Sequence, residues 1–162
     1  MKICVYPGSF DPFTIGHLDV LMSAANLFDR VYVGVLNNTA KNPVFTPGER
    51  VAMINTVIES YGLRNVIADQ FDGLLVDYAK RIHAGSLIRG LRAITDFEYE
   101  FQIDAMNHHL APDIKTVYFM SLPAHSFLSS STIKEVVSFG ADIKGLVPDC
   151  ILKNITERLN KQ

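Results

Sequence analysis

The fold is decided by the stretch Val5-Tyr6-Pro7-Gly8-Ser9-Phe10-Asp11-Pro12-Phe13-Thr14-Ile15-Gly16-His17. The apolar run Ile3–Tyr6 predicts a short buried strand, which Pro7-Gly8 and then Asp11-Pro12 break. From Gly16 onward a helical period places four apolar residues on one face: Leu18, Leu21, Met22 and Ala25. A strand, a tight turn and a helix start together aim backbone N–H groups and the positive helix end at one place. The stretch therefore predicts a phosphate site, which three side chains could complete: Ser9, Thr14 and His17.

Length and composition indicate one ordinary globular domain spanning residues 1–162, with 48% hydrophobic and 20% charged residues. No export signal and no membrane-spanning run is visible, so we expect a cytoplasmic protein without a membrane partner. Two distant cysteines, Cys4 and Cys150, are then expected to be reduced. A net charge of −2 argues against nucleic acid as a partner, because such proteins carry a basic face.

Strand-like and helical runs alternate along the whole chain. Strands are predicted at about 3–6, 30–36, 65–68, 86–88 and 116–120, and helices at about 16–25, 46–61, 74–83, 96–109, 130–139 and 148–159. Such alternation predicts a single doubly wound, Rossmann-like α/β domain with a five-stranded parallel sheet and helices on both faces. In these sheets the ligand lies beyond the carboxyl ends of the strands, where the strand order reverses.

The predicted helices carry two further signals. Thr46-Pro47-Gly48-Glu49 has both halves of a capping box, and Asp96 is expected to cap the helix that reaches about His109. That helix carries one apolar stripe of Phe97, Phe101 and Ala105 and a second of Tyr99, Ile103, Met106 and Leu110. Two stripes indicate cover from both sides. The sheet can supply one cover, and the other is either a neighbouring subunit, which favours a homo-oligomer, or the C-terminal helices.

The groups suited to chemistry are cationic and hydroxyl side chains near the strand ends. The sequence contains no dinucleotide glycine fingerprint, Gly-Lys-Ser/Thr phosphate loop, nucleophile elbow or paired-cysteine metal spacing. It contains instead a set suited to binding anions: His17, Lys41, Arg89, Arg92, Lys134, Ser9, Thr14 and Ser129 to Ser131. The run Ser129-Ser130-Ser131-Thr132 precedes a helix, so it can cap that helix and bind a second phosphate.

Several of these segments carry a family resemblance. Thr14-Ile15-Gly16-His17 resembles the signature of the nucleotidyltransferase superfamily, and Ser129-Ser130-Ser131-Thr132-Ile133-Lys134 resembles its second motif. Five more segments resemble bacterial phosphopantetheine adenylyltransferases: Tyr6 to Pro12, Leu87 to Arg92, Asp96 to Glu100, Met106-Asn107 and His125 to Leu128. Position 134 is Lys where the wider superfamily often has Arg, which weakens a bidentate grip on phosphate. Ser9 stands where Thr is also common and keeps the hydroxyl.

The resemblance implies adenylyl transfer from ATP to 4′-phosphopantetheine, giving dephospho-coenzyme A and pyrophosphate by direct attack without a covalent enzyme intermediate. It implies that His17 stabilises the transition state, that Lys41 and Arg89 hold the phosphate of phosphopantetheine, and that Ser9 and Leu75 also contact that substrate. It implies ATP contacts at Ser9, Phe10, His17, Gly90, Leu91, Arg92, Glu100, His125, Ser126, Phe127, Leu128, Ser129, Ser130 and Ser131. It also implies Mg²⁺ carried on the ATP phosphates, a hexamer, and coenzyme A as a feedback ligand.

Plainer interpretations stand beside these. Arg89 and Arg92 could be surface partners of Asp96 and Glu98, the serine run could only cap a helix, Lys41 could be solvated, and Leu75 could be a core residue. Two other functions also remain. One is the same chemistry on another acceptor, such as nicotinamide mononucleotide, or a cytidylyl transfer. The other is a nucleotide-binding regulatory module without catalysis.

Overall fold

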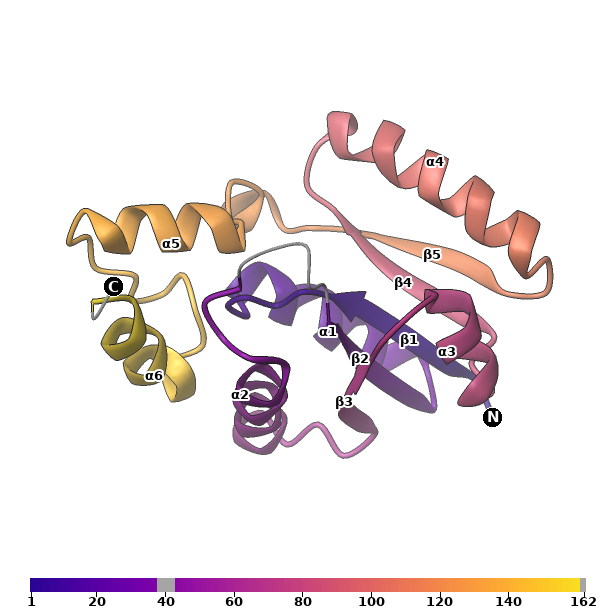
Figure 1. Ribbon diagram of the computed structural model, residues 1–162, viewed down its shortest axis with the longest axis horizontal. Coiled ribbons are helices and arrows are strands. Elements are labelled where there is room, and N and C mark those ends of the chain that lie inside the picture. The colour runs from indigo at the N-terminus through magenta and orange to yellow at the C-terminus, as the bar shows by residue number, and fades with distance from the viewer. Residues whose placement is uncertain (38–42, 161–162) are drawn as a thin grey trace.

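A computed structural model describes residues 1–37 and 43–160 of the chain (Figure 1). Its strands and helices alternate as predicted, in the order β1 (Ile3–Gly8), α1 (Ile15–Leu27), β2 (Arg30–Leu36), α2 (Pro47–Ser60), β3 (Val66–Phe71), α3 (Leu75–Arg81), β4 (Ser86–Leu91), α4 (Ile94–Leu110), β5 (Lys115–Met120), the short 3-10 helix η1 (Pro123–His125), α5 (Ser130–Ser138) and α6 (Asp149–Leu159). Both cysteines are unpaired. None of the helices in the described ranges combines the length and apolar character needed to cross a lipid bilayer.

The sheet has five strands in the order β3-β2-β1-β4-β5, and every pairing is parallel. The chain first builds outward from β1 to β3 and then returns to the other side of β1 to add β4 and β5. The order therefore reverses between β1 and β4. This confirms the predicted α/β class and locates the crevice where such sheets bind ligands, beyond the carboxyl ends of these two strands.

Two apolar cores lie on the two faces of the sheet. One core joins the buried faces of α1, α2, α5 and α6 to inward residues of β1 and β2 such as Tyr6 and Val33. The other joins α3 to the opposite face, where Val5 and Leu87 point. Alternate residues of β1 thus serve different cores, as the period of two in a strand requires. Burial on both faces explains why the sequences of the central strands β1 and β2 are nearly continuous apolar runs.

The helix caps confirm one prediction and correct another. Thr46 accepts a hydrogen bond from the backbone N–H of Glu49, and the Glu49 carboxylate accepts one from the N–H of Thr46, so α2 begins with the predicted capping box. The prediction that Asp96 caps α4 is wrong, because the helix begins earlier and its N-cap is Ala93. Asp96 lies in the first turn, where its carboxylate accepts a hydrogen bond from the N–H of Arg92 at 3.2 Å. An acidic residue does mark the start of α4, as predicted, but it lies in the first turn and not at the N-cap.

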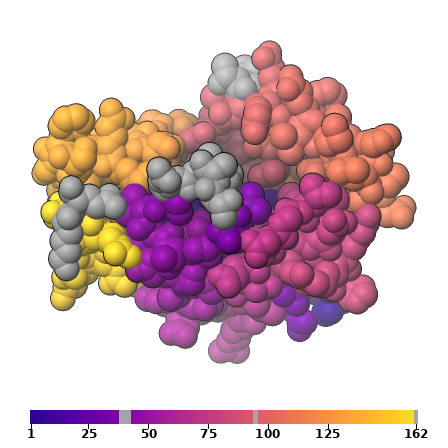
Figure 2. Space-filling model, in the orientation of Figure 1, coloured from indigo at the N-terminus to yellow at the C-terminus, as the bar shows by residue number. Residues whose placement is uncertain are grey.

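Helix α4 is only partly covered by the rest of the chain, and residues of both its apolar stripes are exposed. Phe97 meets Tyr118 of β5 at a ring-centroid distance of 6.0 Å, yet none of the described side chains of α4 is buried. Tyr99 is 65% exposed, and Phe101 and Met106 are each 59% exposed. The C-terminal helices α5 and α6 lie at the other end of the molecule, so the alternative that they cover α4 is wrong (Figure 1). In the space-filling view α4 forms a ridge above a shaded hollow (Figure 2).

Candidate active site

The turn after β1 is shaped by a packed phenylalanine. Phe10 has a backbone φ of 47°, which is the left-handed region, and its side chain is buried. Its ring lies against Tyr6, with the centroids 5.3 Å apart. A Cβ on Gly8 would stand 2.7 Å from the Phe10 ring, so only glycine allows the ring to fold back over the strand end. A strained backbone position held by packing is typical of functional sites.

His17 is fixed at the start of α1 with one nitrogen occupied. Its Nδ1 accepts a hydrogen bond from the backbone N–H of Thr14 at 3.0 Å, and the Thr14 hydroxyl accepts one from the N–H of His17 at 3.3 Å. This is a capping box with histidine in the place of the usual Glu or Gln. The ring also packs against Phe10 and Phe13, with centroids 5.1 and 5.4 Å away. With Nδ1 accepting, the neutral imidazole carries its proton on Nε2.

The charge state of His17 follows from its surroundings. Burial, and secondarily the positive charge of Arg92, lower the pKa of His17 to about 4. The imidazole is therefore neutral near pH 7. A neutral ring whose Nδ1 is occupied can donate one hydrogen bond from Nε2, but it cannot take up a proton readily. The site thus holds a fixed donor rather than a general base.

The end of β4 supplies a cation and a carboxylate. Arg89 Nε lies 3.2 Å from Glu100 Oε2 of α4, and both side chains are mostly buried. Glu100 Oε2 is buried, and its ion pair with Arg89 does not have the geometry of a hydrogen bond within the described part of the chain. Arg89 compensates the charge of this carboxylate, which keeps capacity to accept a hydrogen bond from a hydroxyl or amino group of a ligand. The prediction that Arg89 might pair with Asp96 or Glu98 is not what the structure has, since its partner is Glu100.

Arg92 joins β4 to the segment before α5. Its Nε lies 3.3 Å from the Asp96 carboxylate, and its Nη1 donates to the carbonyl of Leu128 at 2.9 Å. The alternative prediction that Arg92 forms an ion pair with Asp96 is therefore confirmed. Arg92 also lines the cavity described below, so the two roles coexist.

The serine run begins α5 as predicted. Ser129 is the N-cap and accepts a hydrogen bond from the N–H of Thr132 at 2.9 Å. Ser130 Oγ donates to the carbonyl of Pro12 at 2.8 Å, which ties α5 to the turn after β1. The start of α5 therefore faces the start of α1 across the end of β1, and two helix N-termini contribute to one region.

Two adjacent cavities occupy this region. The first, of about 280 Å³, lies between the ends of β1 and β4 and the starts of α1 and α5. The second, of about 320 Å³, has apolar walls that include Leu36, Phe71 and Ile103. The cavities share five wall residues: Pro7, Gly8, Ser9, Arg89 and Glu100. The arrangement can hold two ligands whose reacting ends meet at Ser9 and Arg89.

Most of the predicted site residues come together here. Those lining the first cavity are Ser9, Phe10, His17, Arg89, Gly90, Arg92, Glu100, Leu128, Ser129, Ser130 and Ser131. Leu75 lines the second cavity. Leu91 is buried in β4, and His125, Ser126 and Phe127 lie beside the first cavity without lining it. His125 there pairs with Asp19 of α1 through Nδ1. Lys41 lies outside the described residues.

Sequence reasoning missed two buried charges beside the site, Asp11 and Arg50. Asp11 was recognised only as part of a turn signal. Arg50 carried a usable signal, because it falls on the same face of α2 as the buried residues Met53, Ile54 and Val57. A charged residue on an apolar helix face needs a partner.

The described residues contain no group of three or more His, Cys, Asp or Glu side chains placed to hold a metal ion. Among the described residues that line the first cavity, Glu100 is the one acidic side chain, and Arg89 stands against it. Mg²⁺ bound to polyphosphate keeps most of its ligands as water and phosphate oxygens, so it needs no such cage. The donor set fits a metal that arrives on a nucleotide.

Comparisons with known proteins agree with this geometry. A family model described as cytidylyltransferase-like matches residues 5–136. A phosphopantetheine adenylyltransferase from Natranaerobius thermophilus is 51% identical over 100% of this chain and 99% of its own. One from Lachnoclostridium phytofermentans is 50% identical over 99% of this chain and 97% of its own. A solved structure of a bifunctional NMN adenylyltransferase/ADP ribose pyrophosphatase from Francisella tularensis has a TM-score of 0.71 at 16% identity. It covers 99% of this chain and 49% of that one. At that identity, the last match concerns the fold alone.

Proposed function

Because the chain belongs to the phosphopantetheine adenylyltransferase family, a family of nucleotidyltransferases, we propose that it transfers the adenylyl group of ATP to 4′-phosphopantetheine. A phosphate oxygen of the acceptor attacks the α-phosphorus of ATP, and the bond from that phosphorus to the β-phosphate oxygen breaks. The products are 3′-dephospho-coenzyme A and pyrophosphate. No covalent bond to the protein forms at any stage.

The shared wall between the two cavities is the observation that carries this proposal. ATP would occupy the first cavity, with its phosphates near the starts of α1 and α5, and the pantetheine arm would lie along the apolar second cavity. The two phosphates would then meet at Ser9 and Arg89, which belong to both walls. Leu75 of the second cavity would touch the arm, and Lys41 would join Arg89 on the acceptor phosphate.

The chemistry requires charge neutralisation more than proton transfer. The acceptor is a phosphate monoester with a second pKa of about 6, so it is largely dianionic at pH 7 and needs no base. The neutral His17 imidazole suits this, since its Nε2–H can donate to an α-phosphate oxygen as charge gathers there. Holding two anions in line supplies the remaining advantage.

The other groups would bind ATP. Arg92 and the serines that begin α5 would contact the phosphates, with the backbone of Gly90 and Leu91 beside them. Glu100, which is paired with Arg89, would accept a hydrogen bond from a nucleotide hydroxyl or amino group. The segment from His125 to Leu128 would border the nucleotide. Mg²⁺ carried by ATP would add positive charge at the phosphates, and the side-chain oxygens near it would be those of the serines and of Glu100 in the cavity wall.

The exposed apolar residues on both stripes of α4 support a homo-oligomer, and we propose a hexamer. Tyr99, Phe101 and Met106 together leave a large apolar surface that water would otherwise cover. Coenzyme A carries both a pantetheine arm and an adenine nucleotide, so it would compete for the same two cavities. Sedimentation analysis tests the first proposal, and inhibition of turnover by coenzyme A tests the second.

A panel of acceptors tests the reaction itself. Purified protein is mixed with ATP, Mg²⁺ and one acceptor at a time, and pyrophosphate release is measured. We expect turnover with 4′-phosphopantetheine and none with nicotinamide mononucleotide. The opposite result would mean the same chemistry on another acceptor. Tight ATP binding without pyrophosphate release from any acceptor would indicate a regulatory module instead.

A further inference from the structure

Two buried charges grip the turn between β1 and α1, and they lie outside both cavities. Asp11 is 4% exposed and Arg50 is 2% exposed. We infer that Asp11 and Arg50 are positioning residues for adenylyl transfer. They hold Ser9 and Phe10 in place beside the cavity proposed for ATP and the cavity proposed for the acceptor. With Lys134, they are called the turn anchor below. The inference rests on the proposed function.

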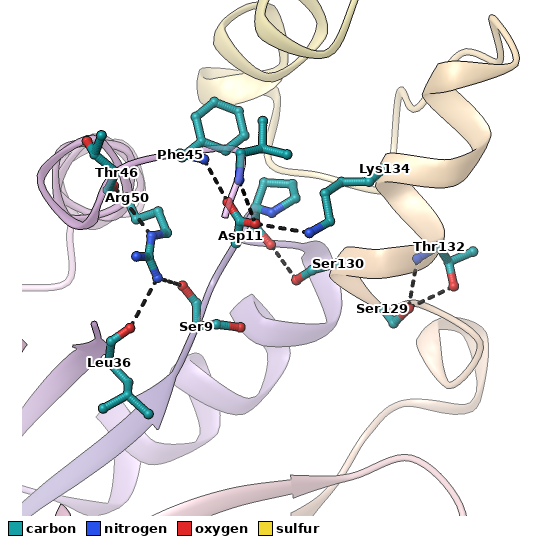
Figure 3. A network of polar contacts seen from close by, with 12 residues as sticks. Ser9, Asp11, Leu36, Phe45, Thr46, Arg50, Ser129, Ser130, Thr132 and Lys134 are labelled. Carbon is teal, nitrogen blue, oxygen red and sulfur yellow. Dashed lines mark hydrogen bonds and ion pairs between the residues drawn. The ribbon is translucent and has the colours of Figure 1, made fainter. Parts of the chain in front are cut away.

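Arg50 of α2 binds three carbonyl oxygens from three different segments (Figure 3). Its Nη1 donates to the carbonyl of Ser9 at 2.6 Å and to that of Leu36 at 3.3 Å, and its Nε donates to that of Thr46 at 3.4 Å. Leu36 ends β2, and Thr46 caps α2, so these two contacts flank the sequence segment that contains Lys41. One guanidinium thus fixes the Ser9 turn relative to both flanks.

Asp11 performs the complementary task from the other side of the turn. Its carboxylate accepts hydrogen bonds from the backbone N–H groups of Val44 at 3.1 Å and Phe45 at 2.9 Å. It also receives the Lys134 ammonium of α5 at 3.0 Å (Figure 3). Lys134 therefore meets a carboxylate in this structure, and the hydrogen bond from Ser130 to Pro12 runs parallel to it.

Stability alone does not account for a cation at position 50. Its neighbours on the inner face of α2 are Met53, Ile54 and Val57, where an apolar side chain would fill the same space without a desolvation cost. Burial indeed lowers the pKa of Arg50, and the charge of Asp11 opposes that shift. Replacing a complete buried ion pair by apolar residues of similar volume is often neutral or stabilising, whereas removing Arg50 alone would leave the carbonyls of Ser9 and Leu36 without this donor. The retained charge is better explained by what it holds.

What it holds is the common wall of the two cavities. Ser9 lines both cavities. Arg50 holds the carbonyl of Ser9, and the contacts of Asp11 hold the chain two residues later. Lys134 links the same turn to α5, whose first residues line the first cavity. A misplacement of about 1 Å between reacting groups can cost about 100-fold in rate. Loss of the turn anchor should therefore slow transfer while the fold persists.

The decisive variant is Arg50→Met, which keeps a long unbranched side chain but removes the donors. We expect the variant to fold with a lowered melting temperature, because the carbonyls of Ser9 and Leu36 lose their donor, and to lose about 100-fold in kcat/KM for both substrates. Arg50→Lys keeps the charge without the fork and should fall between the two. Lys134→Met removes the ion pair between Asp11 and α5 and should mainly raise KM for ATP. The matched control is Arg64→Met, an exposed arginine, which should leave kcat and KM unchanged.

The readout separates positioning from a structural role. Kinetics are measured well below the melting temperature, and far-UV circular dichroism verifies the folded fraction. A merely structural role would lower stability and leave kcat per folded molecule unchanged, and that result for Arg50→Met would overturn the inference. If Arg50→Met does not fold, Arg50→Lys is used in its place. A wild-type kcat/KM in Arg50→Lys would likewise overturn the inference that Arg50 positions Ser9.

Failure of the proposed function looks different. In that case the wild type itself releases no pyrophosphate with 4′-phosphopantetheine, and the variants are compared with whichever acceptor or nucleotide the wild type does use. A wild type that is active with 4′-phosphopantetheine beside an equally active, folded Arg50→Met leaves the function intact and removes only the turn anchor.

Discussion

Replacing His17 with alanine removes a donor, a helix cap and a packed ring in one step. The donor is the Nε2–H, and loss of one such donor to a transition-state oxyanion typically lowers kcat by about 10²–10³, or about 2.7–4 kcal/mol. The cap is the 3.0 Å hydrogen bond from the Thr14 N–H to Nδ1, whose loss costs about 1 kcal/mol of stability. The contacts with Phe10 and Phe13 add about 0.5–1.5 kcal/mol each.

His17→Glu separates these effects. Glutamate at this position can accept from the Thr14 N–H, as Glu49 does for Thr46 at the start of α2. It offers no donor and places a negative charge where a phosphate is expected. We expect His17→Glu to recover the capping part of the stability lost in His17→Ala and to be at least as inactive.

The assay is pyrophosphate release at saturating substrates, with ATP affinity measured separately by calorimetry. Because the Nε2 interaction belongs to the transition state, kcat should fall in His17→Ala while the dissociation constant for ATP changes only slightly. A large loss of ATP affinity with kcat nearly unchanged would refute the role of His17 as a transition-state donor.

Four other outcomes are expected. The pKa of His17 is lowered from 6.5 to about 4, so the unfolded state binds more protons than the folded state between these pH values. The free energy of unfolding should therefore fall as the pH drops from 6.5 to 4. Chemical denaturation at each pH should show a weaker fall in His17→Gln. Thr46→Ala should lose about 1 kcal/mol, or about 2–4 °C in Tm by calorimetry, with turnover unchanged. Gly8→Ala would place a Cβ 2.7 Å from the Phe10 ring and should lower kcat/KM in the same pyrophosphate assay. Phe101→Glu should shift the assembly to smaller species in sedimentation, and an unchanged mass would contradict an interface at α4.

The sequence was informative wherever a pattern is local. The capping box at Thr46 and the serine run before α5 each depend on neighbouring residues, and each appears in the structure where it was predicted. The prediction that Pro7-Gly8 breaks the first strand is wrong, because β1 continues through both residues, which still pair with β2. The alternation of elements then determined that these local features meet at the carboxyl ends of the strands. The boundary of α4 failed because Asp96 acts from inside the first turn, and a sequence pattern cannot distinguish that position from a cap.

Contacts between distant segments could not be predicted. Asp11 binds Val44, Phe45 and Lys134, which are 33, 34 and 123 residues away in the sequence. The partner of Arg89 was likewise mistaken, because which carboxylate of α4 faces β4 depends on the rotation of that helix over the sheet. The sequence identified most of the residues of the site, but which of them form hydrogen bonds and ion pairs with one another became known only from the fold.

A structure with both substrates bound would show whether the two phosphates meet between His17 and Arg89. The protein is crystallised with a non-hydrolysable ATP analogue and 4′-phosphopantetheine. We expect the analogue in the first cavity and the pantetheine arm in the second, with an α-phosphate oxygen within hydrogen-bond distance of His17 Nε2 and the acceptor phosphate on the far side of the α-phosphate, beside Ser9 and Arg89. An α-phosphate lying away from His17, or both ligands competing for one cavity, would contradict this arrangement.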